Sequence, residues 1–143
     1  MTILIDADGC PVVDIAVRIA AGLNIDCVIL CDTSHVFEKP GAKTITVSKG
    51  SDSVDFALVN MVQAGDIVIT QDYGLAAMCL AREAIPISQD GMIYDHDNID
   101  ALLLARHTAK KIRMSGGRLK GSPKRTLNQN AAFERKLKEM LPP

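Results

Sequence analysis

The stretch that decides the fold is Ile3-Leu4-Ile5-Asp6-Ala7-Asp8-Gly9-Cys10-Pro11, an apolar run that stops at an aspartate. In an α/β protein this pattern is typical of a first strand that delivers acidic groups to its carboxyl end, where such folds place their sites. Residues two apart on an extended chain point to the same side, so Asp6 and Asp8 would present two carboxylates together if the strand continues through Ala7. The alternative is structural: Asp8-Gly9 begins a turn and Asp6 caps the next helix.

Length and composition place the chain among single-domain α/β proteins. At 143 residues it is long enough to bury about 68–70% of its unfolded surface. Apolar residues make up 48% of the chain and aromatic residues only 3%. Aliphatic side chains suit a parallel sheet that helices cover on both faces. The shortage of aromatic residues argues against a protein that binds nucleic acid by stacking bases on aromatic rings.

The cysteines and histidines give no sign of disulfides or of a zinc site. The four cysteines form no Cys-x-x-Cys pair, and the three histidines lack zinc-ligand spacing to them. Cys10 sits at a predicted helix start, which lowers a thiol pKa, although nearby carboxylates raise it, so we expect a packing or helix-start role there. With no signal peptide and no apolar run of membrane-spanning length, we expect a cytoplasmic protein without membrane association.

The hydrophobic pattern predicts strands and helices in alternation. Segments with strand patterns are 2–6, 25–31, 43–48, 67–69 and 84–88, of which 43–48 alternates like a half-buried edge strand. Helices are expected at 11–22, 52–64, 73–83, 97 or 98 to 112, and 128–140. This order implies an α/β fold with a doubly wound, mostly parallel sheet in strand order 3-2-1-4-5. We divide the single domain into a core (1–113), a basic glycine-rich linker (114–127) and a C-terminal helix (128–141).

Acidic residues gather at the predicted carboxyl edge of this sheet. Asp6 and Asp8 follow the first strand, Asp52 and Asp55 open the helix before the 67–69 strand, and Asp72 follows that strand. The strands that precede Asp6 and Asp72 are expected to be neighbours at a topological switch point. Carboxylates so placed need a cation, and oxygen ligands of this kind favour Mg²⁺ or Mn²⁺. All five aspartates therefore form a predicted metal site.

Each member of this set also has a purely structural interpretation. Asp52 and Asp72 are placed to cap helices, and Asp55 is compatible with a solvated helix charge. Thr70 and Ser51 either orient acids and waters or are themselves cap and turn residues. The prediction of a site rests on the combination of these residues at one edge of the sheet.

Charge is divided unevenly along the chain. The net charge is -1, yet residues 1–105 hold 15 acidic and 5 basic side chains, whereas residues 106–143 hold 2 acidic and 11 basic ones. This asymmetry indicates a nucleic acid held near an anionic, cation-binding site, or else self-neutralisation of the acidic body by the basic tail. The cations expected to contact phosphates are Arg113, Arg118, Lys120, Lys124 and Arg125. The alternative for this segment is a solvated connector.

Several motifs together resemble a known family. They are Asp6-Ala7-Asp8-Gly9-Cys10-Pro11, Gly50-Ser51-Asp52 with Asp55, Gly65 to Asp72 with Leu75-Ala76, and the basic segment from Ser115 to Pro123. They look like the YaiI/YqxD family of uncharacterised bacterial proteins, which is grouped with PIN-like domains, a fold of metal-dependent ribonucleases. The resemblance implies that Asp6, Asp52 or Asp55, and Asp72 correspond to the acidic PIN cluster, and that Asp8 goes beyond the minimal pattern.

The leading hypothesis is therefore a divalent-metal-dependent nuclease that acts on RNA. Asp6, Asp8, Asp55 and Asp72 are the expected catalytic residues, and the cation would activate the attacking water. A first alternative is a catalytically silent RNA- or partner-binding module that keeps the acids for folding. A second is a phosphatase of the haloacid-dehalogenase kind with Asp6 as nucleophile, although a helix beginning at Pro11 leaves no room for that family's insertion. The sequence leaves open whether the chain forms homo-oligomers.

Overall fold

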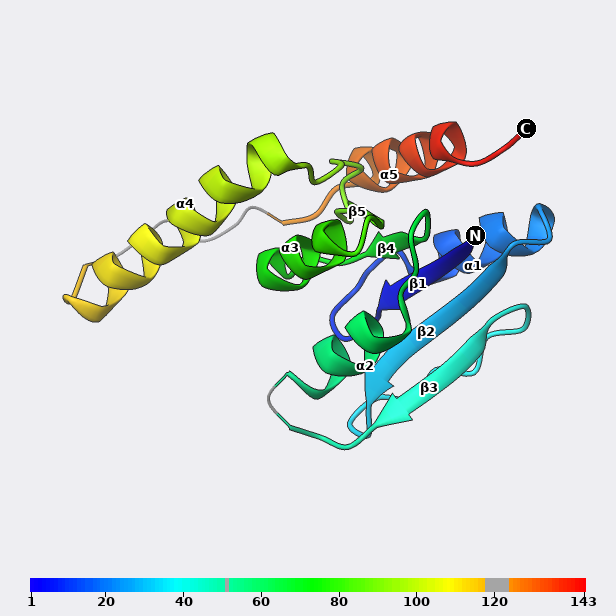
Figure 1. The fold of residues 1–143 in the computed structure, drawn as a ribbon, viewed down its shortest axis with the longest axis horizontal. Helices are drawn as coiled ribbons and strands as arrows, with labels where there is room; N and C mark the ends of the chain where they lie inside the picture. Colours follow the sequence, from blue (N-terminus) through cyan, green and yellow to red (C-terminus); the bar gives the residue numbers. More distant parts are fainter. Residues whose placement is uncertain (51, 118–123) are drawn as a thin grey trace.

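The structure, a computed structural model, describes residues 1–50, 52–117 and 124–143 (Figure 1). Its strands are β1 (Thr2–Asp6), β2 (Asp26–Asp32), β3 (Lys43–Val47), β4 (Ile67–Ile69) and β5 (Ile85–Ile87). Its helices are α1 (Val13–Gly22), α2 (Ser53–Met61), α3 (Tyr73–Ala81), α4 (His96–Met114) and α5 (Leu127–Met140). The elements thus follow the predicted alternation.

The five strands form one parallel sheet in the order β3-β2-β1-β4-β5, which confirms the predicted α/β class and strand order. β1 lies at the centre, where Ile5 is in register with Ile29 of β2 and with Ile69 of β4. Because all strands run in the same direction, their carboxyl ends share one edge of the sheet. Asp6, the last residue of β1, is in register with Leu30, and Asp32 ends β2 two residues farther along at the same edge.

Helices cover both faces of the sheet, which explains the continuous apolar runs in the strands. Ile3 and Ile5 belong to a core cluster with residues of α1 and α5, whereas Leu4 belongs to a second cluster with residues of α2 and α3. Successive side chains alternate between the two faces, so a strand covered on both sides is apolar at every position. Phe133 and Leu137 of α5 are fully buried in the first cluster. The C-terminal helix is therefore part of the core.

The α4 helix is anchored by its first turns and then leaves the body of the protein. Ile99 is buried with Ala76 of α3 and with Tyr94, whereas residues 104–108 and 110–117 are all exposed. Figure 1 shows the second half of α4 extending away from the sheet. Among the described residues, no helix combines the length and the apolar character needed to cross a membrane.

The start of α4 differs from the prediction. The helix begins at His96 and its cap is Asp95, not Asp97 or Asn98. The Asp95 carboxylate accepts hydrogen bonds from the backbone N–H groups of Asp97 and Asn98, and the Asn98 side chain accepts one from the Asp95 N–H. This capping box satisfies the backbone N–H groups of Asp95, Asp97 and Asn98. A cap at Asp97 would leave these N–H groups without those hydrogen bonds.

Candidate metal centre

The five aspartates predicted as ligands line one cleft at the carboxyl edge of the sheet. The cleft has a volume of about 220 Å³ and is lined by Asp6, Asp8, Asp32, Gly50, Asp52, Ser53, Val54, Asp55 and Asp72. Its wall includes a sixth aspartate, Asp32, that the sequence analysis did not select. The structure thus brings together residues from the ends of β1 and β2, the start of α2 and the start of α3.

Thr70 connects the two aspartates at the topological switch point. Its hydroxyl donates a hydrogen bond of 2.8 Å to Asp6 Oδ2 and accepts one of 3.0 Å from the backbone N–H of Asp72. Its carbonyl accepts a bond of 3.2 Å from the buried hydroxyl of Tyr94. Thr70 is itself only 2% exposed. Thr70 therefore fixes the position of the Asp6 carboxylate relative to the start of α3. This is the orienting role that was one of its two predicted interpretations.

Asp72 and Asp52 both precede helices, but only Asp72 caps with its side chain. Asp72 Oδ1 accepts a hydrogen bond of 3.1 Å from the N–H of Leu75 in the first turn of α3. Asp52 has a left-handed backbone (φ 63°) and makes no side-chain cap bond to α2. The interpretation that the Asp52 side chain caps a helix is therefore wrong. The left-handed backbone leaves its carboxylate lining the cleft instead.

Asp8 is held in a turn rather than on an extended strand. β1 ends at Asp6, Ala7 is buried, and the N–H of Cys10 closes the turn by bonding to the carbonyl of Ala7 through Gly9 at φ 74°. Strand geometry therefore stops before Asp8. The Asp8 carboxylate still lines the cleft, but it lies against the end of β2.

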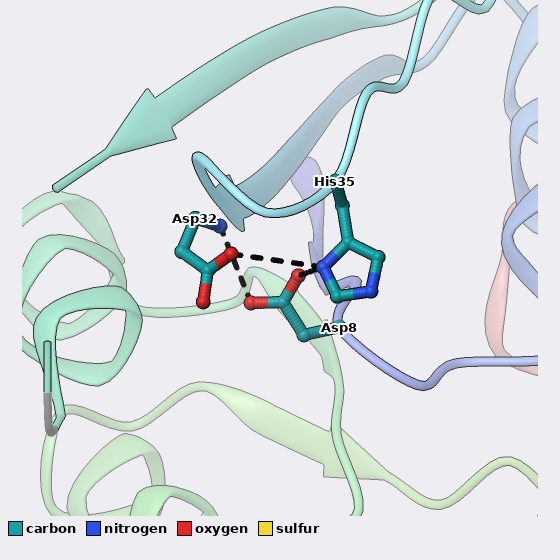
Figure 2. A group of neighbouring side chains, drawn as sticks. All are labelled: Asp8, Asp32 and His35. Atoms are coloured by element: carbon teal, nitrogen blue, oxygen red, sulfur yellow. Dashed lines mark hydrogen bonds and ion pairs between the residues drawn. The ribbon is translucent and has the colours of Figure 1, made fainter. Parts of the chain in front are cut away.

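Figure 2 shows the group formed there by Asp8, Asp32 and His35. Asp8 Oδ2 accepts a hydrogen bond of 3.2 Å from the N–H of Asp32, and Asp8 Oδ1 lies 2.7 Å from His35 Nδ1. The ligand atoms of the three side chains all lie within 4.8 Å of one another. The approach of His35 lacks hydrogen-bond alignment, so the buried Oδ1 of Asp8 has no hydrogen-bond partner among the described residues.

The electrostatics of the cleft show an excess of negative charge. Burial raises the pKa of Asp6 to about 6, with the Thr70 hydrogen bond opposing the rise and Asp72 and Asp8 adding to it. The pKa of Asp55 is raised to about 7, first by burial and then by the carboxylates of Asp72, Asp6 and Asp52. The carboxyl groups of Asp6 and Asp55 therefore hold their protons to a higher pH than usual. A divalent cation bound among these carboxylates would relieve the same repulsion.

Asp55→Asn is expected to stabilise the protein in the absence of metal ions. Native Asp55 keeps its proton up to about pH 7, whereas in the unfolded chain it ionises near 3.8, so this group makes stability fall as the pH rises through that window. Asn cannot ionise. Because the carboxyl is partly solvated, we expect a gain of only about 1–2 kcal/mol at neutral pH.

Urea unfolding of both proteins in EDTA, at several pH values from about 4 to about 7.5, measures this effect. Comparison of the two proteins cancels the carboxyl groups that do not act on Asp55, such as Asp32, whose pKa is lowered by its hydrogen bonds from Ser34. Identical pH profiles for the two proteins would contradict the assignment of the charge repulsion to Asp55.

The residues of the cleft fit a hard divalent cation. They offer carboxylate oxygens from four chain segments, one of them the buried Asp8 Oδ1, which has no hydrogen-bond partner among the described residues, and two basic groups lie at the margin. His35 contacts Asp8, and Arg106 Nη1 lies 3.7 Å from Asp72 Oδ1. Oxygen-rich sites of this composition suit Mg²⁺ or Mn²⁺, and an added imidazole favours Mn²⁺ over Mg²⁺.

Cys10 packs at the foot of this site. It lies partly buried against the main core cluster, where burial raises its pKa, as does the neighbouring Asp6. The expected lowering by a helix N-terminus is wrong, because α1 begins only at Val13 and Pro11 and Val12 belong to the preceding turn. A raised thiol pKa leaves little thiolate, which agrees with the packing role.

The residues predicted to bind nucleic acid are placed differently from one another. Arg113 lies on the exposed last turn of α4, and Lys124 is also exposed. Arg125 is engaged within the chain: its guanidinium bonds to Asn130 Oδ1 at 2.8 Å and to the carbonyl of Gln89 at 2.7 Å, and it pairs with Asp90. Ser51, Arg118 and Lys120 lie outside the described residues.

Sequence reasoning missed three residues at the cleft: Asp32, His35 and Arg106. Asp32 ends an apolar strand as Asp6 does, and that shared pattern was a usable signal. His35 sits in a loop and Arg106 in the middle of a helix, and neither position carries a local signal for contact with the cleft.

Comparison with known proteins shows strong similarity along almost the whole chain. A model described as "Uncharacterized BCR, YaiI/YqxD family" matches residues 4–142. A "UPF0178 protein" of Exiguobacterium sibiricum is 50% identical over 141 residues, covering 99% of this chain and 96% of that protein. Another of Ruminiclostridium cellulolyticum is 49% identical over 137 residues, covering 96% of this chain and 90% of that protein.

A further relative, from Clostridium acetobutylicum, is 43% identical over 143 residues, covering 99% of this chain and 97% of that protein. No solved structure gives a significant match. The family model and these full-length similarities confirm the family that the sequence motifs predicted. The chain belongs to the YaiI/YqxD family.

Proposed function

We propose that this protein is a divalent-metal-dependent nuclease of the PIN-like kind that cleaves phosphodiester bonds in RNA. The observation that carries the proposal is the convergence of Asp6, Asp8, Asp52, Asp55 and Asp72 on one small cleft at the switch point of a parallel sheet. Open α/β sheets bind their ligands at this position. Raised pKa values at Asp6 and Asp55 support a site built for a positive ion.

We assign different roles to the residues of the cleft. Asp6, Asp55 and Asp72 would hold Mg²⁺ or Mn²⁺, with Asp8 and Asp52 completing the wall. Thr70 keeps the Asp6 carboxylate oriented through its hydroxyl. A bound divalent cation supplies charge neutralisation at the phosphodiester and helps to ionise the attacking water.

RNA is the proposed substrate on two grounds. The resemblance to PIN-like ribonucleases points to it, and the exposed cations Arg113 and Lys124 suit a polyanionic partner. Arg118 and Lys120 remain predictions for the same role. Arg125 bonds within the chain and is assigned to folding rather than to phosphate binding.

The proposal is tested by incubating the purified wild-type protein with labelled single-stranded RNA, hairpin RNA and DNA, in Mn²⁺, in Mg²⁺ or in EDTA. We expect cleavage of RNA that needs the divalent ion. Mn²⁺ should also raise the melting temperature in a concentration-dependent way, because an ion that binds the native state stabilises it. RNA binding without cleavage at any Mn²⁺ concentration would instead favour the catalytically silent binding module.

A further inference from the structure

The second half of α4 is a basic surface beside the acidic cleft. Residues 101–117 contain no acidic side chain and include Arg106, His107, Lys110, Lys111 and Arg113. All five are exposed, and this part of the helix projects from the protein body (Figure 1). A strongly basic, solvated helix on an acidic body is an electrostatic surface for a polyanion.

Three of these cations form a line that begins at the cleft. Arg106, Lys110 and Arg113 are spaced by four and three residues, so they share one face of the helix. Arg106 Nη1 lies 3.7 Å from Asp72 Oδ1, which places the first cation of the line at the cleft margin. The helical rise makes the line about 10 Å long, roughly three nucleotides of a stacked strand.

The composition of this surface favours contact with phosphates over contact with bases. Residues 101–117 contain no Asn, Gln, Phe, Tyr or Trp, which are side chains that read base edges or stack on bases. His107 is the one ring in this segment, and because it directly follows Arg106 it lies off the face that carries the line of cations. Lysine and arginine contact phosphates without regard to sequence. The opposite face of the helix carries Leu104 and Ile112 together with Lys111, so the line is the denser of the two basic faces.

We propose that the line of Arg106, Lys110 and Arg113 on α4 binds the phosphate backbone of a single RNA strand and leads it to the acidic cleft, without base specificity. Arg106 exchanges its long ion pair with Asp72 for a phosphate when the strand binds. A cleft of about 220 Å³ holds the volume of only about seven waters, which is room for one phosphate group of a strand and not for a duplex. The choice of RNA and the direction of the strand rest on the proposed function.

The test is fluorescence anisotropy with labelled 20-nucleotide oligo(U), in EDTA so that binding is separated from cleavage. The triple variant Arg106→Gln/Lys110→Gln/Arg113→Gln should bind about 10–100-fold more weakly at low salt. Its slope of log K against log salt should be smaller by about two, the loss expected for three phosphate contacts on a single strand. Oligo(A) and oligo(C) should behave like oligo(U), and a hairpin RNA should bind more weakly.

The matched control is Arg135→Gln/Lys136→Gln/Lys138→Gln on α5, which removes the same charge from a helix of the main core. Equal weakening by both triple variants would overturn the inference, because net charge alone would then explain binding. Unchanged binding by the α4 variant, or no binding by the wild type, would also overturn it.

These outcomes are separate from those for the proposed function. RNA binding that depends on α4 without any cleavage would leave the surface in place and remove the nuclease. Metal-dependent cleavage with normal RNA binding by the α4 variant would leave the nuclease in place and overturn the role of the α4 surface. Circular dichroism of each variant, and the three single substitutions if the triple variant unfolds, keep the comparison between folded proteins.

Discussion

Asp72→Asn and Asp6→Asn are each expected to lower Mn²⁺-dependent RNA cleavage by about a thousandfold. Both side chains lie at the switch point and both are held by hydrogen bonds: the Asp6 carboxylate accepts from the Thr70 hydroxyl, which also accepts from the backbone N–H of Asp72, and the Asp72 carboxylate accepts from the N–H of Leu75. An amide keeps the size of the side chain and removes the negative charge that a divalent cation needs. The loss should appear in kcat/KM and should coincide with loss of the Mn²⁺-induced rise in melting temperature.

The control for both variants is Asp26→Asn. Asp26 is exposed at the first residue of β2, which places it at the opposite edge of the sheet from the cleft. This variant should cleave RNA and respond to Mn²⁺ like the wild type. Full cleavage by Asp72→Asn would remove the acidic cleft from the reaction or trace the cleavage to a contaminating nuclease, and equal losses in all three variants would indicate a general defect.

The central part of the site was predictable because it follows from strand order. Once β1 and β4 are neighbours in a parallel sheet, residues that follow them must meet at one edge, which brings Asp6 close to Asp72. Asp55 follows from the same logic, because its helix α2 leads into β4 from that edge. No long-range contact had to be guessed for these residues.

The outer part of the site was not predictable because it depends on loops. Asp8 contacts Asp32 and His35 only because the chain turns after Asp6 instead of continuing as a strand. Such a turn is compatible with the sequence Asp8-Gly9, but its direction is set by packing against β2. Local residue patterns carry no information on that direction.

The basic residues near the C-terminus differ in what they contact, and the sequence alone did not distinguish them. Arg125 pairs with Asp90, and Arg106 lies near Asp72, so part of the basic segment does neutralise the acidic body. Lys110 and Arg113 instead lie on the exposed half of α4. We therefore assign Arg125 to self-neutralisation and propose Lys110 and Arg113 for polyanion binding, with Arg106 exchanging the first role for the second when a strand binds.

Phe133→Ala is expected to cause a large loss of stability without altering the cleft. Phe133 is fully buried on α5 and packs in the same core cluster as Ile5 and Leu137. Removing a buried phenyl ring forfeits its transfer free energy and leaves a cavity, at a cost of about 3–5 kcal/mol. Natural domains have about 5–15 kcal/mol of stability in total, so this is a large share.

The chain offers a matched control in Phe56→Ala. Phe56 lies on α2 and is 61% exposed, so the same truncation should change the free energy of unfolding by less than about 0.5 kcal/mol. Urea unfolding of both variants measures the difference. Similar small effects would mean that α5 does not unfold together with the sheet. Because Phe133 lies on the α1 side of the sheet and not in the cleft, its variant should keep the Mn²⁺-induced stabilisation, and this separates damage to the core from damage to the site.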